Sequence, residues 1–115
     1  MSKEIGKQAI VTDHGSRRIK DRLGLSKKIA DKVSQKALEN GVSHSETKGS
    51  FKKYIDALYL KHKKANNIKI YHRKIYLFRN EVLITVLNLP NKYSVVADKL
   101  QRIKNQEKEK TKESQ

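Results

Sequence analysis

The most restrictive feature of this sequence is a change in the spacing of its apolar residues at Asn67. From there to residue 87 the apolar residues alternate with other types, which is the pattern of β-strands. Three strands are predicted, at 67–71, 74–79 and 82–87, and two residues separate each strand from the next. Connections this short are typical of tight antiparallel hairpins. The chain must therefore contain a β-meander, and other segments must cover its apolar side.

The predicted register divides the side chains of this meander between two faces. One face is aliphatic and consists of Ile68, Ile70, Ile75, Leu77, Ile84 and Val86. The other face carries cations, aromatic rings and a hydroxyl, from Lys69, Tyr71, Lys74, Tyr76, Phe78 and Thr85. This second face either stacks nucleic-acid bases or is covered by the last helix.

Helical spacing precedes the meander. A short β-branched run at 8–12 predicts a strand that leads into a first helix, which Gly24 ends. A second helix extends from the N-cap Ser26 to Asn40-Gly41. Residues 42–49 have the composition of an exposed loop. A third helix, capped by Ser50, buries four apolar side chains, those of Phe51, Tyr54, Ile55 and Leu58.

A final helix is predicted after Pro90, beginning at Asn91 or Ser94. Its apolar stripe consists of Val96, Leu100 and Ile103. The fold class is therefore α+β, with an N-terminal strand and helices packed on a three- to four-stranded antiparallel meander and with a C-terminal helix. Residues 1–106 form a single basic domain, and the alternating charges of 107–115 predict a fraying helix end or a disordered tail.

Composition limits the partners of this domain. Its 115 residues suffice for one modest core. Lysine and arginine exceed aspartate and glutamate by 15, so the domain is expected to bind a polyanion, with RNA favoured over DNA and no membrane. No apolar stretch reaches the roughly 20 residues of a spanning helix, and no signal peptide is evident. The absence of cysteine fits a reducing cytoplasm, and the four histidines show no metal-ligand spacing, so neither metal nor cofactor is expected.

One cluster of side chains near the N-terminus suits phosphate. His14, Arg18 and Arg22 recur every four residues, which places them on one face of the predicted first helix, beside Arg17. Arginine offers paired donors to phosphate oxygens, and histidine can move a proton near neutral pH. The alternatives are a histidine bonded to the local backbone and arginines paired with Asp13 or Asp21 at the surface.

This His-x3-Arg-x3-Arg spacing, together with the order of elements and a late strand Leu83-Ile84-Thr85-Val86, resembles the toxin-like ribonuclease domains grouped with barnase, EndoU, colicin nucleases and RelE. The chain also looks like small proteins of phages and mobile elements. The resemblance implies metal-independent RNA cleavage, in which His14 moves a proton and Thr85 or Tyr76 orients the substrate. A second proton carrier is left open among four side chains: His44, His62, His72 and Tyr71.

The resemblance implies that Arg18 and Arg22 bind phosphate, and the remaining expected contacts to nucleic acid come from Arg17, Lys69, Tyr71, Arg73 and Lys74. The expected function is thus RNA binding, with or without endoribonuclease activity. Two alternatives stay open. One is a phage inhibitor that binds a host nucleoprotein complex, such as a CRISPR effector or a polymerase, and the other is a DNA-binding accessory factor.

Overall fold

The structure, a computed structural model, describes residues 9–11, 17, 20–21 and 24–113. Its described strands form one mixed five-stranded sheet in the order β1-β5-β4-β3-β2. The strands are β1 (Ile10–Val11), β2 (Val42–Ser43), β3 (Asn67–Tyr71), β4 (Lys74–Arg79) and β5 (Val82–Asn88). The labelled helices are α2 (Lys27–Asn40), α3 (Gly49–Lys61) and α4 (Ser94–Glu113), with short 3-10 turns η1 (His44–Glu46) and η2 (Asn91–Tyr93). The predicted α+β class and C-terminal helix are confirmed, and the sheet is larger than expected because β1 adds in parallel to β5 and β2 adds to β3.

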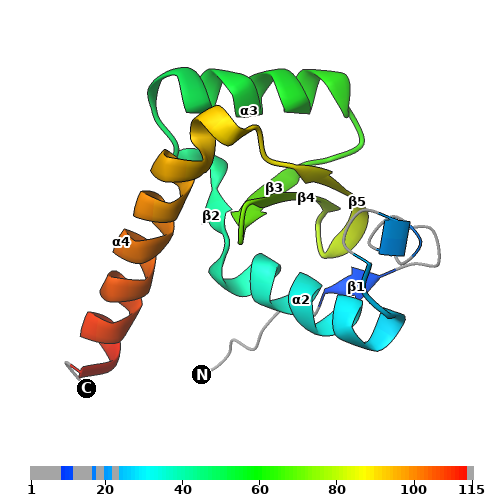
Figure 1. The fold of residues 1–115 in the computed structure, drawn as a ribbon, viewed down its shortest axis with the longest axis horizontal. Helices are drawn as coiled ribbons and strands as arrows, with labels where there is room; N and C mark the ends of the chain where they lie inside the picture. Colours follow the sequence, from blue (N-terminus) through cyan, green and yellow to red (C-terminus); the bar gives the residue numbers. More distant parts are fainter. Residues whose placement is uncertain (1–8, 12–16, 18–19, 22–23, 114–115) are drawn as a thin grey trace.

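Helices cover both faces of the sheet, with α2 on one side and α3 on the other (Figure 1). Tyr93 of η2 and Ala97 in the first turn of α4 also pack on the α3 side. On the α2 side, Ala30 and Ala37 contact the rings of Tyr76 and Phe78. These alanines allow α2 to lie close to the sheet, because they place little bulk between the two backbones. The meander face with Tyr76 and Phe78 was predicted either to stack bases or to be covered by the last helix. It is largely covered, but the covering helix is α2.

The meander forms where the alternating pattern predicts it. His72 and Arg73 form the connection between β3 and β4, with φ of 48° and 63°. Two consecutive positive φ values are those of a type I′ turn, whose twist matches the flanking strands. The predicted pairs of Ile70 with Ile75 and of Ile68 with Leu77 are confirmed.

The second ladder differs from the predicted register. A β-bulge interrupts the pairing of β4 with β5, so that Leu77 pairs with Thr85 and Phe78 with Leu83, which leaves Ile84 as the extra residue. An extra residue in one strand reverses the alternation beyond it. Val86 therefore packs on the α2 side, opposite Tyr76, and Thr85 belongs to the α3 side, which is the reverse of the prediction.

The helices before the meander agree with their sequence signals. The Ser26 hydroxyl caps α2 by accepting from the Ile29 N–H, and the helix ends at Asn40 as predicted. Phe51, Ile55 and Leu58 are buried along α3. The first residue of α3 is Gly49 and its N-cap is Lys48, without a side-chain bond, so the predicted cap Ser50 lies two positions after the actual one, inside the helix.

The predicted exposed loop at 42–49 is wrong in part. Val42 and Ser43 form the edge strand β2, and the Val42 and Thr47 side chains are buried. A reciprocal cap between Ser43 and Glu46 orders η1, since the Glu46 carboxylate accepts from both the N–H and the hydroxyl of Ser43. The segment is too short to show a period, so its composition alone indicated a loop.

The face that α4 turns to the sheet also differs from the predicted apolar stripe. Ala97 is 4% exposed, whereas Val96 and Ile103 of the predicted stripe are 37% and 43% exposed. The helix turns Ala97 to the sheet because Tyr93, just before its first turn, is already anchored against the ring of Phe51. The helix continues through Glu113, into the segment for which a fraying helix end or a disordered tail was predicted, since glutamate and lysine are good helix formers.

Gly41 provides a test of how closely α2 and β3 approach. A Cβ atom there would lie 2.5 Å from the Ala37 carbonyl oxygen and 3.0 Å from the Lys69 Cβ. Its φ of −67° is open to any residue, so the constraint is space alone. We expect Gly41→Ala to lower the free energy of unfolding by roughly 1–3 kcal/mol, as measured by urea denaturation. A value equal to wild type would show that the junction of α2 with β2 relaxes freely.

Candidate functional site

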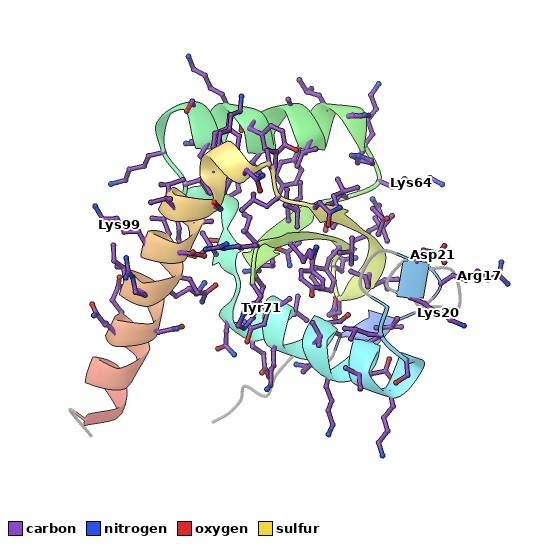
Figure 2. All side chains as sticks on the ribbon, viewed as in Figure 1. Arg17, Lys20, Asp21, Lys64, Tyr71 and Lys99 are labelled. Carbon is purple, nitrogen blue, oxygen red and sulfur yellow. The ribbon has the colours of Figure 1, made fainter. Side chains whose placement is uncertain are left out.

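The predicted N-terminal phosphate cluster is only partly visible. His14, Arg18 and Arg22 lie outside the described residues, so the structure does not test them. Arg17, Lys20 and Asp21 are helical and exposed, and they lie at the right-hand edge of the view in Figure 2, away from Tyr71 near its centre. The N–H of Gly24 donates to the Lys20 carbonyl with a φ of 69° at Gly24, which confirms that this helix ends there.

A groove of about 370 Å³ lies between α2 and the hairpin of β3 and β4. Seven residues line it: Leu25, Val33, Lys36, Tyr71, His72, Lys74 and Tyr76. Three of them, Tyr71, Lys74 and Tyr76, are among the predicted site residues. The tight turn explains their proximity, because Tyr71 and Lys74 are paired directly across the hairpin and Tyr76 follows two residues later on the same face.

The side chains of the groove combine three kinds of surface. Leu25 and Val33 provide an apolar wall from the α2 side. The ring of His72 stands perpendicular to that of Tyr71, with the centroids 4.2 Å apart. Lys74 donates to the Asn88 side-chain oxygen at 2.6 Å, which holds its ammonium group near the sheet. Such a surface can contact a planar ring and an anionic group at the same time.

Tyr76 lies deepest in this groove and is 1% exposed. Burial, followed by the neighbouring Tyr71, raises its pKa from 10.0 to about 12. The hydroxyl is therefore protonated at neutral pH and can donate a hydrogen bond, but it does not serve as a base. Thr85 is also buried, but it lies on the face of the sheet opposite Tyr76 and not on the face where it was predicted, so it does not line the groove.

Two predicted contacts, Arg73 and Lys69, belong to other surroundings. Arg73 makes a bidentate pair with Asp98 of α4, with an Nη2 to Oδ2 distance of 2.6 Å, and this pair lowers the pKa of Asp98. Lys69 is half-buried near the sheet edge, where burial and then the charge of Lys104 lower its pKa. Neither cation lines the groove.

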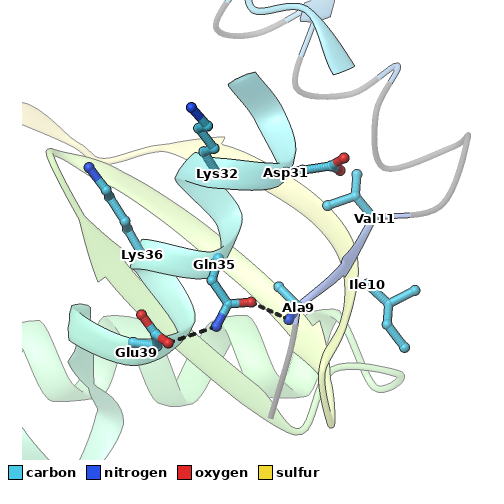
Figure 3. A pocket seen from close by; sticks show the side chains of 8 residues that line it. All are labelled: Ala9, Ile10, Val11, Asp31, Lys32, Gln35, Lys36 and Glu39. Carbon is cyan, nitrogen blue, oxygen red and sulfur yellow. Dashed lines mark hydrogen bonds between the residues drawn. The ribbon is translucent and has the colours of Figure 1, made fainter. Parts of the chain in front are cut away.

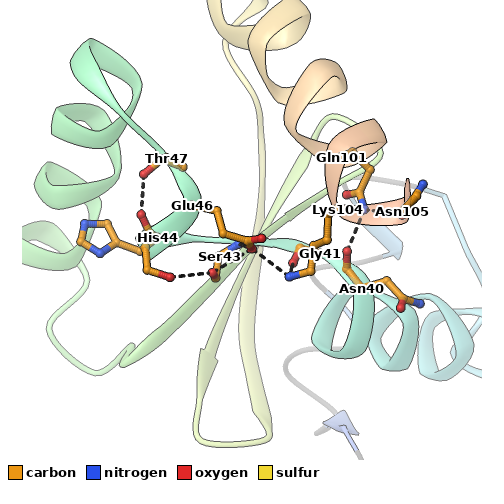
Figure 4. A network of polar contacts seen from close by, with 10 residues as sticks. Asn40, Gly41, Ser43, His44, Glu46, Thr47, Gln101, Lys104 and Asn105 are labelled. Carbon is orange, nitrogen blue, oxygen red and sulfur yellow. Dashed lines mark hydrogen bonds and ion pairs between the residues drawn. The ribbon is translucent and has the colours of Figure 1, made fainter. Parts of the chain in front are cut away.

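The edge beside Lys69 is held by a network of polar contacts from α4 (Figure 4). The Lys104 ammonium donates to the Gly41 carbonyl and to the Glu46 carboxylate, both at 2.8 Å. Gln101 donates to the Asn40 carbonyl at 2.7 Å. Burial acts to raise the pKa of Glu46, but the bonds from Lys104 and Ser43 outweigh it and the pKa falls. These groups satisfy the end of α2, so their role is structural.

A second hollow, of about 650 Å³, lies between β1 and α2 (Figure 3). Gln35 accepts from the Ala9 N–H at 2.6 Å and donates to Glu39 at 2.9 Å. Asp31 and Glu39 stand beside Lys32 and Lys36 here. This mixture of signs suits a polyanion less well than the groove, whose lining contains no carboxylate among the described residues.

The outer side of α2 adds a line of cations to the groove. Lys28, Lys32 and Lys36 are exposed and repeat every four residues, so they are about 6 Å apart along the helix. None of the three forms an ion pair with a described residue. The four-residue spacing places these lysines on one side of the helix, and the packing of α2 on the sheet brings Lys36 to the groove as well.

The histidines do not assemble a catalytic centre within the described part of the chain. His44 is bonded to Asp56 through Nε2 and contacts the ring of Tyr59 edge-on. His62 ends α3, and His72 lies in the hairpin turn. No group of three potential metal ligands was found among the described residues. Nor does any helix in that part of the chain have the length and apolar character needed to cross a membrane.

Comparisons of this chain with protein-family models, with curated proteins and with solved structures found no match.

The protonated Tyr76 gives a pH-dependent expectation. Because folding raises its pKa, the associated stabilisation is complete below pH 10 and is lost as the pH rises through about 12. Tyr76→Phe cannot ionise, so the free energy of unfolding of wild type should fall relative to this variant across that interval. Urea denaturation followed by circular dichroism at neutral and alkaline pH measures the difference. A difference that does not change with pH contradicts the burial of this hydroxyl.

Proposed function

We propose that this protein is an RNA-binding domain whose interface comprises the outer side of α2 and the groove beside it. The observation that supports this most directly is the line of Lys28, Lys32 and Lys36, three exposed cations without carboxylate partners among the described residues. Lysines in this arrangement contribute affinity for phosphates through release of counterions. The net charge of +15 supports the same class of partner.

RNA is preferred over DNA in this proposal because of the groove. The bases of a duplex expose only their edges to a protein, whereas the bases of RNA loops and single strands expose their faces, which can stack on aromatic side chains. Tyr71 and His72 place such side chains next to Lys36 and Lys74. The groove thus combines the two requirements of single-strand binding, a cationic track and an aromatic platform.

The proposal is for binding without cleavage. The predicted catalytic residues are His14, Thr85 and Tyr76. Of these, His14 lies outside the residues that the structure describes. Tyr76 is a protonated hydroxyl, and Thr85 is on the opposite face of the sheet. Tyr76 and Thr85 therefore do not form an acid–base pair around one phosphate, as cleavage through the 2′-hydroxyl requires.

Two triple variants of equal charge test this interface. We expect Lys28→Gln/Lys32→Gln/Lys36→Gln to weaken binding of a single-stranded RNA roughly tenfold or more at low salt, and to reduce the salt slope by about two. Fluorescence anisotropy over a salt series measures both quantities. The matched control is Lys52→Gln/Lys53→Gln/Lys61→Gln, which removes three exposed cations from α3 on the other side of the sheet.

Equal losses in the two triple variants would show that affinity follows net charge alone and that α2 is not the interface. Affinity that does not change with salt would contradict the electrostatic basis altogether. Electrophoresis of the same RNA after incubation tests the second part of the proposal. Intact RNA is expected, and products that end in a 2′,3′-cyclic phosphate would establish cleavage.

A further inference from the structure

The Tyr76 hydroxyl is a polar group in an unusual position. The side chain is 1% exposed, yet the hydroxyl forms no hydrogen bond with any described residue. The hydroxyl oxygen is not one of the fully buried polar atoms that lack a partner, which among the described residues are Ser34 Oγ and Gln101 Oε1, so it remains open to a ligand from the groove. Two other tyrosines do have partners: the half-buried Tyr59 accepts from the Ile68 N–H, and the buried Tyr93 donates to the Ser50 carbonyl. Tyr76 instead lines the groove.

The groove presents a ring directly beside this hydroxyl. Tyr71 is half-buried, and His72, perpendicular to it at 4.2 Å, restricts the positions its ring can take. The type I′ turn fixes both residues at the end of the hairpin. A ring that is already held in place loses little conformational entropy when another ring stacks on it.

Two cations stand at the groove, one from each side. Lys36 comes from α2, and Lys74 comes from β4, where Asn88 accepts one of the three donors of its ammonium group. The lining thus offers a stacking surface, a hydrogen-bond donor at the base of the groove and two cations. These groups match the base and the phosphate of a nucleotide.

We propose that this groove is the seat of one unpaired nucleotide, whose base stacks against Tyr71 and bonds to the Tyr76 hydroxyl while Lys36 and Lys74 contact its phosphate. This inference rests on the proposed RNA binding and adds which part of the RNA is recognised. A volume of about 370 Å³ is in the lower range of small-molecule sites and leaves no room for a duplex. The hydroxyl can both donate and accept, so it can bond to the free edge of any unpaired base. It therefore selects unpaired over paired bases more than it selects one base over another.

The experiment uses the full chain and a short single-stranded RNA that carries 2-aminopurine, a base whose fluorescence falls when it stacks on an aromatic ring. We expect quenching upon binding by wild type and by Tyr71→Phe, which keeps the ring. Tyr71→Leu should lose the quenching and bind roughly tenfold or more weakly, as expected for one stacked base. Tyr76→Phe should bind several-fold more weakly, and its unchanged thermal midpoint at neutral pH would exclude a folding defect.

The outcomes separate this inference from the function on which it rests. If no variant and no wild type binds RNA, the proposed function fails. If wild type binds RNA, but Tyr71→Leu and Tyr76→Phe bind it equally well with the same quenching, the nucleotide seat is overturned and the electrostatic interface stands. A fully paired duplex of the same sequence that competes as well as the single strand would also overturn the seat.

Two further arms identify the source of the nucleotide. Adenosine and uridine monophosphates share the ring and phosphate chemistry, so they serve as competitors. If these mononucleotides displace the labelled RNA only at concentrations far above those at which unlabelled RNA does so, the ligand is a nucleotide within a chain, as proposed. If a mononucleotide competes at concentrations similar to the RNA, recognition of an RNA chain is overturned in favour of a free nucleotide. Lys53→Gln on α3 should leave all these values unchanged, whereas Lys36→Gln should weaken them.

Discussion

The rest of this structure depends on the burial of β4 from both sides. Ile75 and Leu77 point into one helix-covered face, and Tyr76 and Phe78 point into the other, and all four are at most 1% exposed. A strand buried on both faces requires a layer of helices on each, so α2 and α3 are both needed even in a chain of this size. The same requirement creates the candidate site. The α2 layer does not cover the polar end of the hairpin, which is left open beside Leu25 and Val33.

Local signals in the sequence were sufficient for most elements of the fold, and long-range pairing was not readable from them. Ser26, Asn40 and the two-residue turns marked the helix and strand ends correctly, because caps and tight turns depend on residues that are close in sequence. The bulge at Ile84 was missed because nothing in an aliphatic run marks which residue is the extra one. The strands β1 and β2 have two residues each, too few to show alternation, and their pairing depends on partners far along the chain.

Only the part of the candidate site that lies on the hairpin could be predicted from the sequence. Tyr71, Lys74 and Tyr76 could be placed together because one tight turn sets their spacing. Lys36 could not be added, because its position beside Tyr71 depends on how α2 packs against the sheet, and no periodicity encodes that angle. Arg73 was assigned to nucleic acid from its charge, whereas its pairing with Asp98 arises from α4, which begins twenty-one residues after it in the chain.

The contacts of α4 with the end of α2 also determine when the fold can be completed. Gln101 and Lys104 bond to carbonyls that precede them by 61 and 63 residues. During synthesis, α2, β2 and the meander are all made before these donors exist, so the Asn40 and Gly41 carbonyls must first be satisfied by water. Assembly of the edge at β2 is therefore a late event that waits for the last helix, while the hairpin of β3 and β4, with its local contacts, can form early.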